Sequence, residues 1–175
     1  MAANFSFELH DGSKCTVMYG RTTKPRDLLE FLRSKFPNLS IQIVTDETVY
    51  NIEHLRWTIR QSWFAKDRGV MLAKRVELDL LMRIAGASQI SEAIKIAGAK
   101  ENIPFYMACI GAQSEVRELA EFLREKCELM EFRKAGNKEV LQRLGINERE
   151  IDLVGKEKIV LLLAEKGLLA VAEKI

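Results

Sequence analysis

A continuous apolar run from Ile103 to Ile110, between Asn102 and Gly111, constrains the fold more than any other segment. Strict alternation of apolar and polar residues indicates a strand with one solvent-exposed face, whereas an unbroken apolar run of this length indicates a strand that is buried on both faces. The chain therefore has to contain a sheet, together with other elements that cover it.

Helical periodicity dominates the remaining sequence, and only a few further segments have the character of strands. Asp11-Gly12-Ser13 is typical of a hairpin turn, and Gly98 is a typical helix terminator. We expect strands at residues 5–9, 15–19, 41–44 and 103–110, and helices at residues 25–36, 47–67, 74–85, 88–97, 114–126, 138–144, 147–154 and 156–175. Residues 127–133 are ambiguous. This order predicts the α+β class: a single, helix-rich domain over residues 1–175, in which a small β-sheet packs with several helices.

Several function classes find no support in the composition. The three cysteines, Cys15, Cys109 and Cys127, are widely spaced, and the only histidines are His10 and His54. A structural zinc site needs about four clustered ligands, so we expect no metal and no other cofactor. No apolar run approaches the roughly 20 residues that span a bilayer, and the N-terminus has no signal-peptide pattern. We therefore expect a cytoplasmic protein with reduced thiols and no membrane association.

Positive charge is concentrated in the middle of the chain. Residues 56–111 contain nine Lys and Arg against five Asp and Glu, a local excess of +4, although the whole chain has a net charge of only +2. A local basic patch attracts phosphate even when the whole protein is nearly neutral. The commoner alternative is a solvated helix face.

Within the long helix expected at residues 47–67, Arg56 and Arg60 fall between two apolar arcs, one of which contains Trp57 and Phe64. One interpretation is a helix packed on two sides, with the arginines at its rim. The other is a surface where guanidinium groups contact phosphates and an aromatic ring stacks on a base.

A junction between two expected helices lies at Gly86 to Gln89, and Lys74, Arg75 and Arg83 precede it. We expect Ser88 to cap the second helix, whose N-terminal N–H groups suit a phosphate. Gly86 allows close approach, and the Gln89 amide can both donate and accept. An ordinary helix corner explains the same residues. If Arg83 contacts phosphate, Arg83→Glu should weaken nucleic-acid binding and leave the fold intact.

The C-terminal helix is apolar on two sides. Apolar residues spaced three and four apart form a stripe that consists of Leu161, Ala164, Leu168, Val171, Ala172 and Ile175. Such a helix lies either deep in its own core or against a partner. The second alternative predicts that Val171→Asp with Ile175→Asp abolishes partner binding.

Catalysis finds little support. We find no phosphate-binding loop, no dinucleotide fingerprint, and no nucleophile or carboxylate motif around either histidine. We therefore expect a binding protein rather than an enzyme, and no small-molecule substrate. The alternative hypothesis is an enzyme whose active site has no recognisable sequence motif. This hypothesis predicts a concave pocket that contains titratable residues with shifted pKa values.

One part of the sequence consists of Val76-Glu-Leu-Asp-Leu-Leu-Met-Arg-Ile-Ala-Gly-Ala-Ser-Gln-Ile-Ser-Glu-Ala-Ile94, followed by Gly98 and the expected strand Phe105-Tyr-Met-Ala-Cys-Ile-Gly111. This part resembles the small non-catalytic subunit of the KEOPS tRNA-modifying complex, the PRPK-binding protein family. Length, element order and the apolar C-terminal helix agree with this family over most of the chain. Residues 112–155 contain no motif that resembles it.

The resemblance implies a non-enzymatic protein that binds tRNA and the complex's kinase/ATPase subunit, in support of threonylcarbamoyladenosine modification. It implies that the 3′ CCA end docks near Arg83 to Gln89, and that the stripe from Leu161 to Ile175 faces the kinase. The phosphate contacts that we expect are Arg56, Arg60, Lys74, Arg75 and Arg83. The alternative is a protein-interaction module that regulates an atypical kinase without contacting RNA.

Overall fold

A computed structural model describes residues 4–173 and has the α+β class. The chain forms two compact units, each assembled from two separate stretches of sequence. Unit 1 comprises residues 4–46 and 99–132, and unit 2 comprises residues 47–98 and 133–173. Folding of the chain as one domain stays a prediction.

Unit 1 contains a small antiparallel sheet. Its strands are β1 (Phe5–Glu8), β2 (Lys14–Arg21), β3 (Ser40–Thr45), β4 (Phe105–Ile110) and β5 (Glu128–Leu129). The order is β1-β2-β4-β3, and β5 pairs with the end of β2, where Gly20 lies opposite Leu129. All six residues of β4 are buried, which confirms the prediction made from the apolar run.

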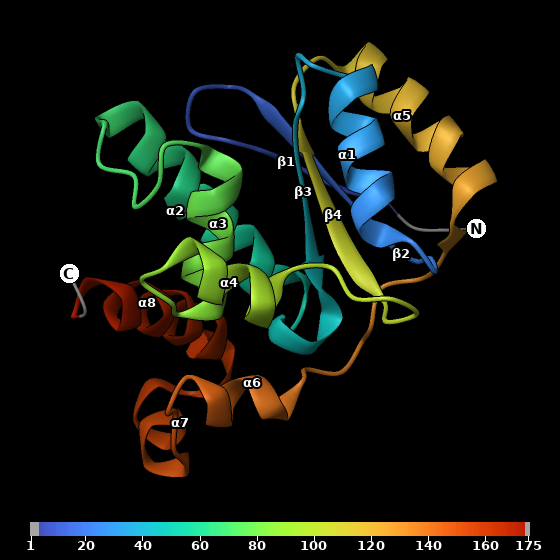
Figure 1. Cartoon of the computed structure of the whole chain (residues 1–175). Helices are drawn as coiled ribbons and strands as arrows, with labels where there is room; N and C mark the ends of the chain where they lie inside the picture. Colours follow the sequence, from blue (N-terminus) through green and yellow to red (C-terminus); the bar gives the residue numbers. More distant parts are fainter. Residues whose placement is uncertain (1–3, 174–175) are drawn as a thin grey trace. The chain divides into compact units, whose positions relative to one another are not determined.

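Two helices of unit 1, α1 (Pro25–Lys35) and α5 (Gln113–Lys126), pack on one face of this sheet (Figure 1). Alternate residues of the central strands, such as Ile41, Ile43 and Met107, share a core with Leu32 of α1 and Leu119 of α5. This core holds the two helices in place side by side.

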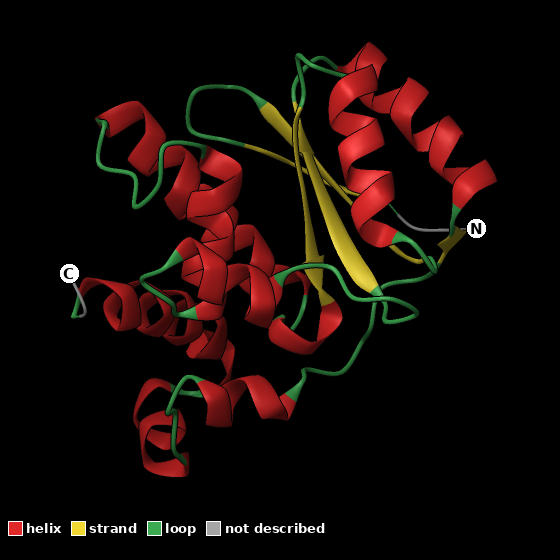
Figure 2. Cartoon of the chain, viewed as in Figure 1, coloured by secondary structure: helices red, strands yellow, loops and turns green. Residues whose placement is uncertain are grey.

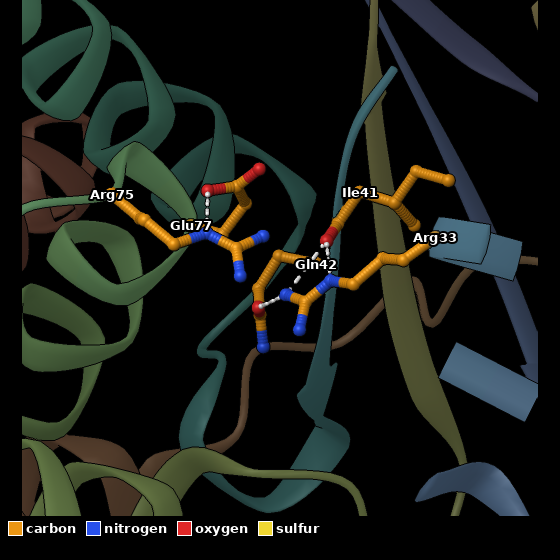
Figure 3. Close-up of polar contacts among 5 residues, drawn as sticks. All are labelled: Arg33, Ile41, Gln42, Arg75 and Glu77. Carbon is orange, nitrogen blue, oxygen red and sulfur yellow. Dashed lines mark hydrogen bonds and ion pairs between the residues drawn. The ribbon is translucent and has the colours of Figure 1, made fainter. Parts of the chain in front are cut away.

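Hydrogen bonds from an arginine side chain connect α1 to β3. The guanidinium of Arg33 donates to the carbonyl oxygen of Ile41 from Nε (3.1 Å) and Nη2 (3.0 Å), and Nη2 also donates to Oε1 of Gln42 at 2.7 Å (Figure 3). Hydrogen bonds from a charged donor are stronger than neutral ones, so this contact fixes the position of α1 along the strand.

Unit 2 is built from helices, as Figure 2 shows. They are α2 (Ile52–Arg68), α3 (Val76–Ala85), α4 (Ile90–Ala97), α6 (Lys138–Arg143), α7 (Glu148–Val154) and α8 (Ile159–Ala172). Short 3₁₀ turns at Asp46–Thr48 and Lys156–Lys158 precede α2 and α8. Within the described residues, no helix has the length and apolar character needed to cross a membrane.

Local signals explain where the helices of unit 2 begin and end. The side chain of Asn51 accepts a hydrogen bond from the His54 N–H and caps α2, and Asn147 forms a capping box with Glu150 before α7. Gly69 and Gly86 end α2 and α3 with φ of 67° and 63°, a conformation that glycine adopts without strain. The long helix therefore begins at Ile52, not at residue 47 as predicted.

A neutral histidine is enclosed in unit 2. His54 is fully buried, and its Nδ1 accepts a hydrogen bond from the backbone N–H of Tyr50 at 3.2 Å. Burial, together with the nearby positive charge of Arg143, lowers the pKa of His54 to about 3. The imidazole is therefore uncharged at neutral pH and serves as a hydrogen-bond acceptor in the interior.

Candidate functional site

The structure places Arg56 and Arg60 on α2, with Trp57 between them. The guanidinium carbons lie 5.9 Å and 5.5 Å from the centre of the Trp57 ring, within the range of a cation–π contact. All three side chains are half-buried. The helix thus presents two guanidinium groups and an indole together.

Arg56 already has a partner of opposite charge. Its Nη2 lies 2.6 Å from Oε2 of Glu53, one turn earlier on α2. The Nε atom of Arg56 is buried and has no hydrogen-bond partner among the residues that the structure describes. Arg56 is therefore fixed at the helix surface with part of its donor capacity unused.

Sequence reasoning missed Arg68 as a member of the same helix surface. Its guanidinium lies 5.0 Å from the ring of Phe64, a side chain that is 48% exposed. Phe64 follows Arg60 by four residues, and Arg68 follows Phe64 by four. That spacing was the available signal, because residues four apart are neighbours on a helix. We name Arg56, Trp57, Arg60, Phe64 and Arg68 the arginine–aromatic face.

Lys74 and Arg75 lie immediately before α3, and both are exposed. The Nε atom of Arg75 is 3.4 Å from Oε2 of Glu77 (Figure 3). Because more than half of the Arg75 side chain is exposed, water screens this pair, and it holds the guanidinium only weakly.

The prediction that Arg83 contacts phosphate is wrong. Its side chain is only 5% exposed, and its Nε donates to Oδ2 of Asp79 at 2.6 Å. Oδ1 of the same Asp79 carboxylate accepts the backbone N–H of Leu72 at 2.6 Å. Arg83 is thus committed to a buried ion pair that anchors the loop before α3, and it does not face a ligand.

The junction between α3 and α4 differs in one respect from the prediction. The helix α4 begins at Ile90 with Gln89 at its cap position, so Ser88 is not the N-cap, and no side chain caps this terminus. Gly86 and Ala87 are buried, Ser88 is half-buried and Gln89 is exposed. Gln89 and the uncapped N–H groups of α4 are therefore the accessible polar groups here.

Arg143 of α6 contacts this junction with its guanidinium group. Its guanidinium donates to the carbonyl oxygens of Ile84 (3.0 Å) and Ala85 (2.9 Å), the last two residues of α3, and to Thr48 (3.2 Å). A positive charge suits the carbonyl end of a helix, where the dipole is negative. Arg143 is a positioning residue that sequence reasoning missed.

The predicted site does not form one cluster along α3. Lys74 and Arg75 precede its first residue, whereas Gly86 to Gln89 follow its last. A helix of 10 residues is about 15 Å long, so these two groups lie at opposite ends of α3. Only Arg56 and Arg60 are brought together by direct packing around one ring.

The apolar stripe predicted on α8 is also partly corrected. Ala164 is 3% exposed and Val171 is fully buried, so both belong to the core of unit 2. Leu161 is 41% exposed, Leu168 is half-buried and Ala172 is exposed. Leu169, which is not part of the predicted stripe, is 43% exposed. Ile175 lies outside the described residues.

We name Leu161, Leu168, Leu169 and Ala172 the outer face of α8. Successive spacings of seven, one and three residues place these side chains on one side of the helix. The opposite side contains Ile159, Leu163 and Gly167, which are buried within unit 2. Glu165 is also exposed and follows Leu161 by four residues, so the side of α8 that a partner can reach is apolar except for one carboxylate.

No protein-family model matches this sequence, and a comparison with curated proteins found no match. Between residues 4 and 173, no three His, Cys, Asp or Glu side chains are grouped as a metal site would require.

Proposed function

We propose that this protein is a non-catalytic, cytoplasmic, tRNA-binding subunit of a KEOPS-type complex, and that it also binds the kinase/ATPase subunit of that complex. The observation that carries the RNA-binding part is the packing of Arg56 and Arg60 on either side of Trp57. The resemblance of residues 76–111 to the small KEOPS subunit supports the choice of tRNA.

The arginine–aromatic face has the chemistry that single-stranded RNA ends require. Guanidinium groups bind phosphate oxygens through paired N–H donors, and an aromatic ring accepts an unstacked base against its face. Phe64 and Arg68 extend this combination by two helical turns toward the C-terminus of α2. A single-stranded RNA that runs along the surface of α2 would contact guanidinium groups and aromatic rings in turn.

The α3–α4 junction supports recognition of a terminal nucleotide. The amide of Gln89 offers both a donor and an acceptor, and the first N–H groups of α4 have no side-chain cap. Arg143 holds the last turn of α3 in place, which fixes the backbone that leads into these groups. Fixed polar groups lose less conformational entropy on binding.

The outer face of α8 supports the proposed contact with the kinase/ATPase subunit. Leu161 and Leu169 each expose more than 40% of their surface, on a helix whose other side is buried. An apolar helix face that docks in a groove is a recurring mode of protein recognition.

Binding of the intact protein to tRNA, with and without the 3′ CCA, tests the proposal. We expect binding that requires the CCA and that weakens as salt rises, because phosphate contacts release counterions. Equal binding to both RNAs would retain RNA binding but remove the terminal recognition. Absence of binding to either RNA, at low salt, would contradict the proposal.

A paired set of variants locates the interface. Arg56→Ala with Arg60→Ala should weaken tRNA binding roughly tenfold or more and make the salt dependence shallower. The matched control is Arg149→Ala with Lys156→Ala, which removes two exposed charges elsewhere in unit 2. Equal effects of the two pairs would show general charge attraction and no specific surface.

A protein-interaction module without RNA binding is the second candidate. The observation in its favour is the neutralisation of the predicted basic cluster: Arg56 pairs with Glu53, Arg75 with Glu77, and Arg83 with Asp79. This candidate predicts kinase binding through the outer face of α8 together with no tRNA affinity.

A further inference from the structure

Unit 1 contains a pocket that the proposed function does not use. It is a shallow, open depression with a volume of about 510 Å³. The pocket lies between the first half of α1 and the end of α5. The residues that line it are Thr22, Thr23, Lys24, Asp27, Leu28, Phe31, Phe122 and Lys126.

Two stacked phenylalanine rings form its apolar part. The rings of Phe31 and Phe122 lie 5.2 Å apart between centres, with an angle of 18° between their planes. Phe31 is nevertheless 50% exposed, although its neighbour Leu32 is completely buried. A large ring supported on one side and open on the other is a ready platform for a further flat group.

The polar residues around these rings carry both signs of charge. Nζ of Lys126 lies 5.7 Å from the centre of the Phe122 ring, and Lys24 also lines the pocket. Neither lysine forms an ion pair with any residue that the structure describes. Asp27 precedes Phe31 by four residues, so both side chains lie on the same side of α1.

We propose that this pocket binds one ribonucleotide of a single-stranded RNA segment, a second RNA contact that rests on the proposed RNA-binding function. The base stacks on Phe31, Lys24 and Lys126 attract its phosphates, and the Asp27 carboxylate accepts a hydrogen bond from the ribose 2′-hydroxyl. Hydrogen bonding to the 2′-hydroxyl is how proteins distinguish RNA from DNA.

Asp27 decides between ligand classes. Ribose hydroxyls supply the donors that the Asp27 carboxylate needs, and the two lysines offset its repulsion of the phosphates. Two lysines neutralise too little charge to hold a free triphosphate, but they suit the phosphates on either side of one nucleotide in a strand. The lining therefore fits an RNA segment best.

Nuclear magnetic resonance of the full chain, with labelled amides, tests this site during titration with a short oligouridylate. We expect saturable shifts at residues 22–31 and 122–126. Phe31→Ala should weaken the affinity measured from these shifts roughly tenfold or more, because stacking carries most of the contact. Leu153→Ala, which trims another exposed apolar side chain, is the matched control and should change nothing.

Three comparisons separate the outcomes. The deoxy oligonucleotide should bind more weakly, and Asp27→Asn should reduce that preference; equal binding of RNA and DNA would overturn the role of Asp27. Uridine monophosphate should bind far more weakly than the strand, and equal binding would overturn the choice of a strand.

The Arg56→Ala, Arg60→Ala variant separates this inference from the proposed function. Shifts in unit 1 should persist in that variant. Shifts confined to unit 2 in the wild-type protein would overturn the pocket and leave the proposed function intact. Shifts in unit 1 alone would support the pocket and contradict the arginine–aromatic face, and no shifts at all would overturn both.

Discussion

Gly167 in the middle of α8 lies directly against the backbone carbonyl oxygen of Arg83 in α3, so closely that a methyl group on Gly167 would overlap that oxygen. A second contact lies close by, where a methyl group on Gly86 would come within 3.3 Å of the Ala170 side chain. The helix proposed to bind the kinase is therefore braced against the end of α3 and the junction that follows it.

Gly167→Ala should destabilise unit 2, although alanine favours a helix over glycine by about 1 kcal/mol. The added methyl group has to displace backbone, and overpacking of this kind costs about 1–3 kcal/mol. Urea unfolding measures the change. Glu165→Ala compared with Glu165→Gly, at an exposed position of α8, gives the propensity difference alone. A stability gain for Gly167→Ala as large as that difference would contradict the close contact.

Arg83→Met should reduce the free energy of unfolding by about 3–5 kcal/mol, because it leaves the buried Asp79 carboxylate without its cation. Arg83→Glu should be at least as damaging, since it places two carboxylates in contact. This replaces the sequence-based expectation that Arg83→Glu leaves the fold intact. The double variant Asp79→Asn, Arg83→Met should recover part of the loss, because Asn can still accept the Leu72 N–H. Thermal and urea unfolding distinguish these results.

Acid should destabilise the protein through His54. Its pKa is about 3 when folded and near 6.5 when unfolded, so below pH 6.5 the unfolded chain binds a proton that the folded chain does not. This contribution to stability is present above pH 6.5 and is lost as the pH falls toward 3, with a slope of at most about 1.4 kcal/mol per pH unit.

Urea unfolding across this pH range measures the slope for His54. His54→Asn, which retains an acceptor for the Tyr50 N–H, should flatten the dependence, and His10→Asn at an exposed position is the control. An unchanged slope in His54→Asn would show that other groups cause the acid sensitivity.

Leu161→Asp with Leu169→Asp should abolish co-purification with the proposed kinase/ATPase partner and leave the fold and any tRNA binding intact, because each residue exposes about 40% of its surface to solvent. Val171→Asp should instead unfold unit 2, since that side chain is completely buried. Circular dichroism and pull-down together separate the two effects. A folded double variant that still binds the kinase would remove the outer face of α8 from the proposal.

The positions of most elements were predictable because their signals are local. The apolar run before Gly111, the glycines that end α2 and α3, and the asparagine that begins α7 act within a few residues. The α2 prediction failed at its start, because Asp46–Thr48 forms a separate 3₁₀ turn before the Asn51 cap. The two units were not predictable, since each combines stretches that are distant in sequence.

The sequence by itself determined which residue types occur at which helical spacing, and hence the pairing of Arg56 and Arg60 around Trp57, which needs only one helix. Tertiary structure alone decided that Arg83 and Val171 point inward while Leu161 and Leu169 stay exposed. The physical reason is that α3 and α8 are apolar on more than one side. Periodicity cannot orient such a helix, so its rotation is set by the neighbours that bury it.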